Sequence, residues 1–148
     1  MAVNPLVQLG SLNRLRGSVV IPSYPSLNVT ASYLSRRGIG MELTGDLTQM
    51  IDTMTGMVTS PEPFVPADIT VSLLKTQPLA QLWISQMQDT TVLGNITVHT
   101  DTSTFLHFDF QNVAIMRMSR VTYDGTDPTV DFTLRGTYVL NQTLWTLA

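Results

Sequence analysis

Two histidines each stand two positions before an aspartate, as His99-Thr-Asp101 and His107-Phe-Asp109, and these pairs are the first candidates for chemistry. Residues two apart on a β-strand project from the same face, so either pair could orient an imidazole or share a metal ion. A metal site needs about three or four converging ligands, and the chain has no cysteine to add to them. We therefore interpret both pairs as polar side chains on the solvent-facing side of strands.

No motif for nucleophilic or phosphate chemistry accompanies the histidines. No serine lies in a Gly-x-Ser-x-Gly sequence, and Gly38-Ile39-Gly40 is too short for a dinucleotide-binding loop. The eleven acidic residues are scattered, so no pair of carboxylates is set apart for acid–base catalysis. We expect no catalytic residue, no metal site and no cofactor, and hence no enzyme.

The composition favours an assembly. The 148 residues suit one domain, but only 13% of them are charged, whereas about 25% is typical of soluble domains. A surface with so few charges is easier to explain if other copies cover much of it. The net charge of −3 without a basic run argues against a nucleic-acid-binding protein, and no apolar stretch is long enough to predict a membrane span.

The pattern of apolar residues predicts a mainly β fold, either a β-sandwich or a small closed β-barrel, with one helix at an edge or end. Residues 1–16 are expected to form an extended apolar N-terminal arm, and residues 35–40 a polar turn. Pro78 and the spacing of Leu79, Leu82, Trp83 and Met87 predict a helix over residues 78–88. The expected strands are 18–21, 27–33, 42–48, 54–59, 69–75, 94–100, 105–118 and 129–140.

Two of these strands have one polar face. Glu42 and Asp46 alternate with Leu43 and Leu47, and residues 129–138 alternate in the same way, with Asp131 and Arg135 on the polar side. The methionines at 50, 54, 57, 116 and 118 lie on expected strands, where they would fill the core, although the low overall charge also favours an interface between copies.

Several stretches together resemble the tail tube proteins of contractile-tailed bacteriophages. They are Gly17 to Pro22 with Asn28 to Leu34, Met54 to Pro63, Leu73 to Gln77 before the helix, and Thr133 to Asn141. The resemblance covers nearly the whole chain, 1–148, as a single tail-tube domain.

The resemblance implies a fold shared with the haemolysin-coregulated protein of type VI secretion. Such subunits form hexameric rings that stack into a helical tube in the virion tail, which is assembled in the host cytoplasm. The tube contacts sheath, baseplate and tail terminator proteins, and genomic DNA passes through its lumen without specific binding.

Within that expectation, Glu42 and Asp46 are our candidates for the lumen, because their carboxylates would repel phosphate. Arg135 lies on an equally polar face and would attract DNA, which leaves the choice of lumen strand open. The candidate contacts between copies come from the arm and from the 35–40 segment: Leu6, Leu9, Leu12, Arg36 and Arg37. Deleting residues 1–16 is expected to leave a folded domain that does not stack.

Two alternatives stay open. The same fold could serve as the tube of a related contractile injection system, which gene neighbourhood would distinguish from a phage. A monomeric β-sandwich that binds carbohydrate or peptide is the second alternative; it would display exposed aromatic side chains, whereas Trp83 and Trp145 lie in apolar contexts.

Overall fold

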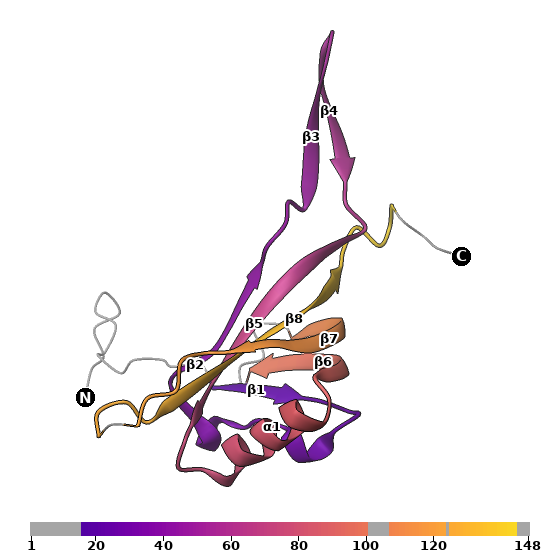
Figure 1. The fold of residues 1–148 in the computed structure, drawn as a ribbon. Coiled ribbons are helices and arrows are strands. Elements are labelled where there is room, and N and C mark those ends of the chain that lie inside the picture. Colours follow the sequence, from indigo (N-terminus) through magenta and orange to yellow (C-terminus); the bar gives the residue numbers. More distant parts are fainter. Residues whose placement is uncertain (1–15, 101–106, 124, 145–148) are drawn as a thin grey trace, which may run out of the picture.

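The computed structural model describes residues 16–100, 107–123 and 125–144, and within them the fold is mainly β (Figure 1). One α-helix, α1 (Pro78–Asp89), and two short 3₁₀ turns, Pro25–Leu27 and Ala31–Tyr33, accompany the strands of this part of the chain. The strands are β1 (Gly17–Val20), β2 (Leu34–Leu43), β3 (Thr48–Thr53), β4 (Gly56–Pro61), β5 (Phe64–Leu74), β6 (Val92–Thr100), β7 (Phe108–Met118) and β8 (Thr129–Val139).

Six strands form one antiparallel sheet in the order β1-β6-β7-β8-β5-β2. The sheet curls until its two edge strands meet. At this meeting point, Ile39 of β2 packs over Gly17 of β1. A Cβ atom added to Gly17 would lie 3.1 Å from Ile39 Cδ1. The result is a nearly closed, barrel-like sheet, which confirms the predicted fold class.

The core lies inside this curled sheet. On β5, alternate residues from Val65 to Leu73 are fully buried, and β8 contributes Val130, Phe132 and Leu134 in the same way. This alternation matches the period of a strand with one buried face, so the sequence pattern alone places these side chains inward.

Helix α1 covers the inner side of the sheet and agrees with the predicted span 78–88. Proline is favoured at the first helical position, where its missing N–H costs nothing. Trp83 is completely buried, lies 5.4 Å from the ring of Phe132, and donates its indole N–H to the Leu27 carbonyl at 3.2 Å. The helix is therefore fixed to both β8 and the first 3₁₀ turn. No helix of the described residues is long and apolar enough to cross a membrane.

Two predicted segments near the start of the chain are wrong. The expected polar turn over residues 35–40 is part of β2, where Gly38 takes a left-handed φ of +62° and the register shifts between Leu34 and Ile39. Glycine adopts this conformation freely, so the segment bulges within a strand where a turn was expected. The expected strand over residues 27–33 is broken by two 3₁₀ turns, and Val29 makes an isolated bridge with Val19.

Strands β3 and β4 form a separate two-stranded hairpin that projects away from the barrel (Figure 1). The predicted continuous strand over residues 42–48 is wrong, because β2 ends at Leu43. Pro66 is the cause: its carbonyl accepts the Thr44 N–H at 2.9 Å, but its ring nitrogen cannot return a second bond. The chain then leaves the sheet past Gly45, where an added Cβ would lie 2.8 Å from Val65 Cγ2.

The hairpin also changes the assignment of residues 54–59. Met54 and Thr55 form its tight turn, and the second strand begins only at Gly56. Pro66 lies inside β5. The predicted N-terminal arm, including Leu6, Leu9 and Leu12, falls outside the described residues except for Arg16.

Candidate functional site

The base of the β3–β4 hairpin is held by a small set of hydrogen bonds, both across the base itself and to the residues that follow β8. The Glu62 N–H donates to the Leu47 carbonyl at 3.1 Å, and the Leu140 N–H donates to the Pro63 carbonyl at 3.1 Å. The side-chain amide of Asn141 donates to the carbonyls of Glu62 at 2.7 Å and Leu47 at 3.4 Å. Asn141 has a left-handed φ of 53°, which asparagine tolerates better than most residues. The Asn141 side chain thus joins the segment that enters the hairpin to the segment that leaves it.

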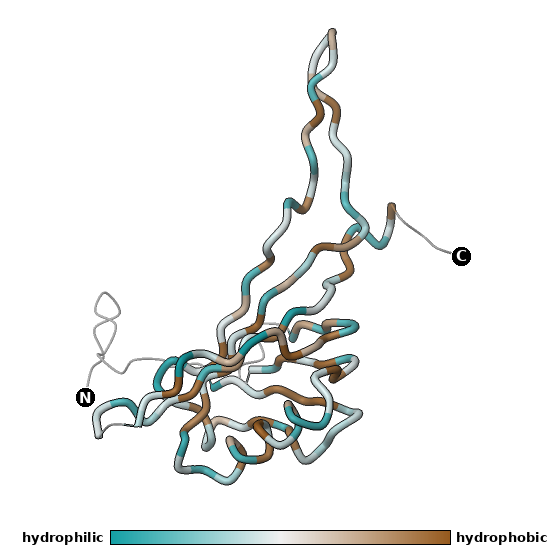
Figure 2. The backbone as a smooth tube through the Cα atoms, in the orientation of Figure 1, coloured by the Kyte–Doolittle hydropathy of each residue, from teal (hydrophilic) through white to brown (hydrophobic). Residues whose placement is uncertain are grey.

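Both faces of the hairpin carry large apolar side chains. Ile51 lies directly opposite Val58 on one face. Met50 is paired with Thr59 and Met57 with Asp52, so the two methionines are diagonal neighbours on the other face. Figure 2 shows hydrophobic segments along both of these strands, well away from the barrel.

These side chains are open to solvent in the single chain. Met50, Ile51, Met57 and Val58 are each about half exposed, from 49% to 61%, and Met54 at the turn is fully exposed. The expectation that the methionines fill the core is wrong for these positions. Apart from their contact with each other, β3 and β4 make only marginal contact with the other described elements. An isolated two-stranded hairpin is only marginally stable in water, and the barrel adds little packing to this one.

The outer face of the barrel next to the hairpin is polar. Arg135 on β8 binds Asp68 on β5 through two parallel bonds, Nε to Oδ1 at 2.7 Å and Nη2 to Oδ2 at 3.1 Å. The hydrogen bond from Arg135 lowers the pKa of Asp68. The charge of Arg135, which would otherwise attract DNA, is therefore balanced by a carboxylate.

The two candidate lumen residues are not on one strand. Glu42 is exposed on β2, opposite Asp68 in the register, whereas Asp46 is exposed in the connection that leads to the hairpin. Leu47, expected on the buried face, is 47% exposed. The predicted shared strand face is wrong, and the assignment of Glu42 and Asp46 to a lumen stays a prediction.

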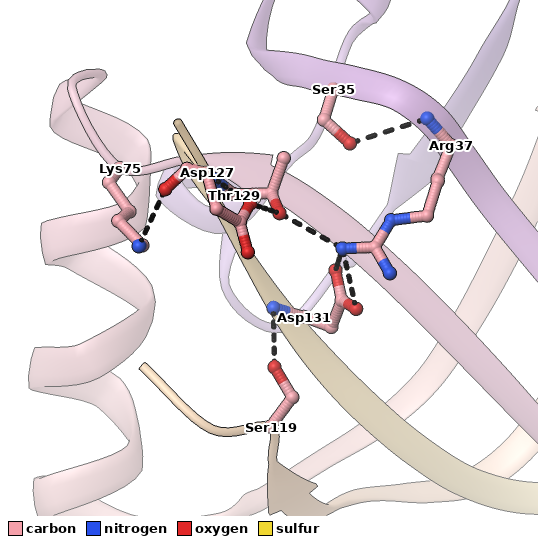
Figure 3. Close-up of polar contacts among 7 residues, drawn as sticks. All are labelled: Ser35, Arg37, Lys75, Ser119, Asp127, Thr129 and Asp131. Carbon is pink, nitrogen blue, oxygen red and sulfur yellow. Dashed lines mark hydrogen bonds and ion pairs between the residues drawn. The ribbon is translucent and has the colours of Figure 1, made fainter. Parts of the chain in front are cut away.

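A second polar cluster lies at the other end of β5 and β8 (Figure 3). Arg37 Nη2 donates to Thr129 Oγ1 at 2.9 Å and lies 3.1 Å from Asp131 Oδ2. Thr129 in turn donates its hydroxyl to Asp127 at 2.6 Å, which lowers the pKa of that carboxyl, and Lys75 donates to the Asp127 carbonyl at 2.9 Å. Arg37 is thus bound within its own chain.

This cluster borders a surface pocket of about 350 Å³. Its lining is Arg37, Ser119, Arg120, Thr122, Asp127, Thr129 and Asp131. Arg36, the neighbour of Arg37 on β2, is exposed to solvent. The pocket residues come from three separate stretches of the chain. Of the two arginines predicted as contacts between copies, Arg37 lines the pocket and Arg36 does not. Arg120 was not predicted, because it has no distinguishing sequence pattern of its own.

The histidines form a small group on the outer surface of β6 and β7. The rings of His99 and His107 lie 5.5 Å apart, and His107 Nε2 is 3.5 Å from Asp109 Oδ2. Asp109 also accepts the Thr97 hydroxyl at 2.8 Å. Asp101 falls outside the described residues, and the described part of the chain holds no group of three side chains that could bind a metal ion.

The exposed hairpin and the polar cluster at the far end of the barrel are thus the two candidate interaction surfaces of this chain. No family model matches the sequence, and no curated protein gives a significant match.

Proposed function

We propose that this chain is the structural subunit of a bacteriophage tail tube. Copies form hexameric rings, the rings stack, and the resulting channel delivers DNA into the host. The proposal combines the resemblance of the sequence to contractile tail tube proteins with one structural observation, the exposed apolar hairpin.

The hairpin supports an assembly because the single chain leaves its apolar side chains uncovered. Contiguous apolar surface of this kind marks an interaction site in a soluble protein. The two outer edges of the hairpin also present unpaired backbone groups, and β3 and β4 carry no lysine or arginine to discourage pairing with another chain. A structural subunit that is covered by its own copies accounts for both features and for the low charge of the chain.

The same features fit the tube of a related contractile injection system, and gene neighbourhood distinguishes the two. The structure gives less support to a monomeric binding module. Trp145 lies outside the described residues. Among the residues that the structure describes, Trp83 is completely buried, and the exposed aromatics Phe64 and Tyr123 lie near opposite ends of β5, so these two do not form a shared platform for a ligand.

Electron microscopy of the purified chain over a concentration series tests the proposal. Rings or hollow filaments of uniform width are the expected result. A matched variant replaces residues 48–61 by Asn-Gly, because Leu47 and Glu62 are already hydrogen-bonded neighbours and a two-residue turn can join them. This variant should keep the barrel fold and form no filaments. A wild-type chain that stays monomeric at every concentration, with or without tail components, would refute the proposal.

A further inference from the structure

The two candidate interaction surfaces lie at opposite ends of the molecule. The hairpin leaves the barrel beside Phe64, which pairs with Val139, whereas Arg37 lies near the other end, where Leu74 pairs with Thr129 (Figure 1). The eleven residues of β5 span about 35 Å, and the hairpin strands add about 20 Å, at the usual rise per residue. A hairpin of this length can overlap the barrel of a copy placed end to end.

The segment from Gly38 to Leu74, which contains the hairpin, carries only negative charge. Residues 38–74 include five carboxylates and no lysine or arginine: Glu42, Asp46, Asp52, Glu62 and Asp68. Asp68 is bound by Arg135, but the side chains of the other four make no hydrogen bond or ion pair with any described residue. Asp52 lies one position before the end of β3, close to the turn.

The far end carries an excess of positive charge. Among the described residues it holds four cations, Arg36, Arg37, Lys75 and Arg120, against the carboxylates of Asp127 and Asp131. Asp124 of the same loop lies outside the described residues. The guanidinium groups of Arg36 and Arg120 make no hydrogen bond or ion pair within the described chain, and Arg120 lines the pocket.

We propose that the hairpin tip of one copy docks on the Arg36–Arg120 end of the next copy, with Asp52 beside Arg120. This inference rests on the proposed function and names the partner surface for it. Complementary charge sets the register of such a contact. Tyr123, which is 97% exposed in the same loop, offers an aromatic ring to Met54, the exposed methionine of the turn. A contact between two different surfaces of the same chain repeats from copy to copy, and it builds an open filament when the copies are placed end to end and do not close into a ring.

Cross-linking tests this contact directly, because the chain has no cysteine of its own. Thr55→Cys protein, altered in the exposed turn, is mixed with Thr122→Cys protein, altered in the pocket that Arg120 lines, so Asp52 and Arg120 both stay in place. The mixture is treated with a short bis-maleimide, which spans a longer distance than a disulfide. Each sample is also examined for filaments by electron microscopy. The control pairs Asp89→Cys, an exposed site at the end of α1, with Thr122→Cys.

The expected result is a cross-linked dimer in the Thr55–Thr122 mixture, at least about tenfold more abundant than in the control, a ratio that corresponds to about 1.4 kcal/mol. Filaments without this cross-link, or equal cross-linking in the control, would overturn the docking and leave the tube proposal standing. The specific cross-link without filaments would support the docking and count against a tube. The absence of both would overturn both proposals.

Discussion

Replacing Ile51 and Val58 together with threonine should weaken assembly without unfolding the barrel. The two side chains face each other on the hairpin and are 49% and 51% exposed in the single chain. Complete burial of such a side chain contributes about 1.5–3 kcal/mol, so covering the exposed half contributes about 1 kcal/mol for each. Threonine keeps the branched Cβ that suits a strand while it removes apolar surface.

The double variant therefore loses up to about 2 kcal/mol for each hairpin contact, which corresponds to about 30-fold in an equilibrium constant. The measurement is the lowest protein concentration at which filaments sediment, and this threshold should rise by about the same factor. Val92→Thr is the matched control, because Val92 is 61% exposed on β6 of the barrel.

Three results would refute this reasoning. An unchanged threshold would mean that the apolar faces of the hairpin are not covered in the assembly. An equal rise in the Val92→Thr variant would mean that assembly responds to surface hydrophobicity in general. A fall in the melting temperature of the dissociated double variant would show that the hairpin contributes to the barrel core.

Three further predictions concern the barrel and its connection to the hairpin. Trp83→Phe should lower the free energy of unfolding by about 2 kcal/mol in urea titrations, because it removes buried volume and leaves the Leu27 carbonyl without its donor; a loss below about 0.5 kcal/mol would contradict this. The bond from Arg135 lowers the folded-state pKa of Asp68 below the ordinary 3.8, so its contribution to stability is present above pH 3.8 and is lost as the pH falls through the lowered value. For this partly exposed pair we expect less than about 1 kcal/mol, and Asp68→Asn should remove that dependence. Asn141→Gly keeps the left-handed backbone but removes the amide bonds, so hydrogen exchange at the hairpin base should quicken by about tenfold with little change in melting temperature; unchanged exchange would argue against the bonds.

The elements whose apolar residues recur at a regular helical or strand spacing could be predicted from the sequence. Helix α1 follows from Pro78 and its apolar spacing, and the inward faces of β5 and β8 follow from alternation, because each pattern is local to one element. The hairpin was not predicted, because a pattern local to one strand does not show whether another element covers that strand. Its strands alternate without a buried face, so their apolar residues looked like those of core strands.

The functional surfaces depend on long-range placement. Arg37 meets Asp131 across 94 positions of sequence, and Arg135 meets Asp68 across 67. No local pattern marks these partners, because strand order and register bring them together. Arg37 was predicted from sequence as a contact between copies, and only the structure shows that its charge is already shared within the chain.

The amino-acid sequence by itself determined the β-rich class, the single helix of the described chain and most of the core, since hydrophobic periodicity acts over a few residues. The tertiary structure decided that β2 leaves the sheet at Leu43, that the methionines of the hairpin are exposed, and that acidic and basic ends lie at opposite poles. The physical reason is that burial and ion pairing depend on which segments meet across the sheet. That depends on the register of the barrel and on single residues such as Pro66, which cannot supply the second bond that would keep β2 in place.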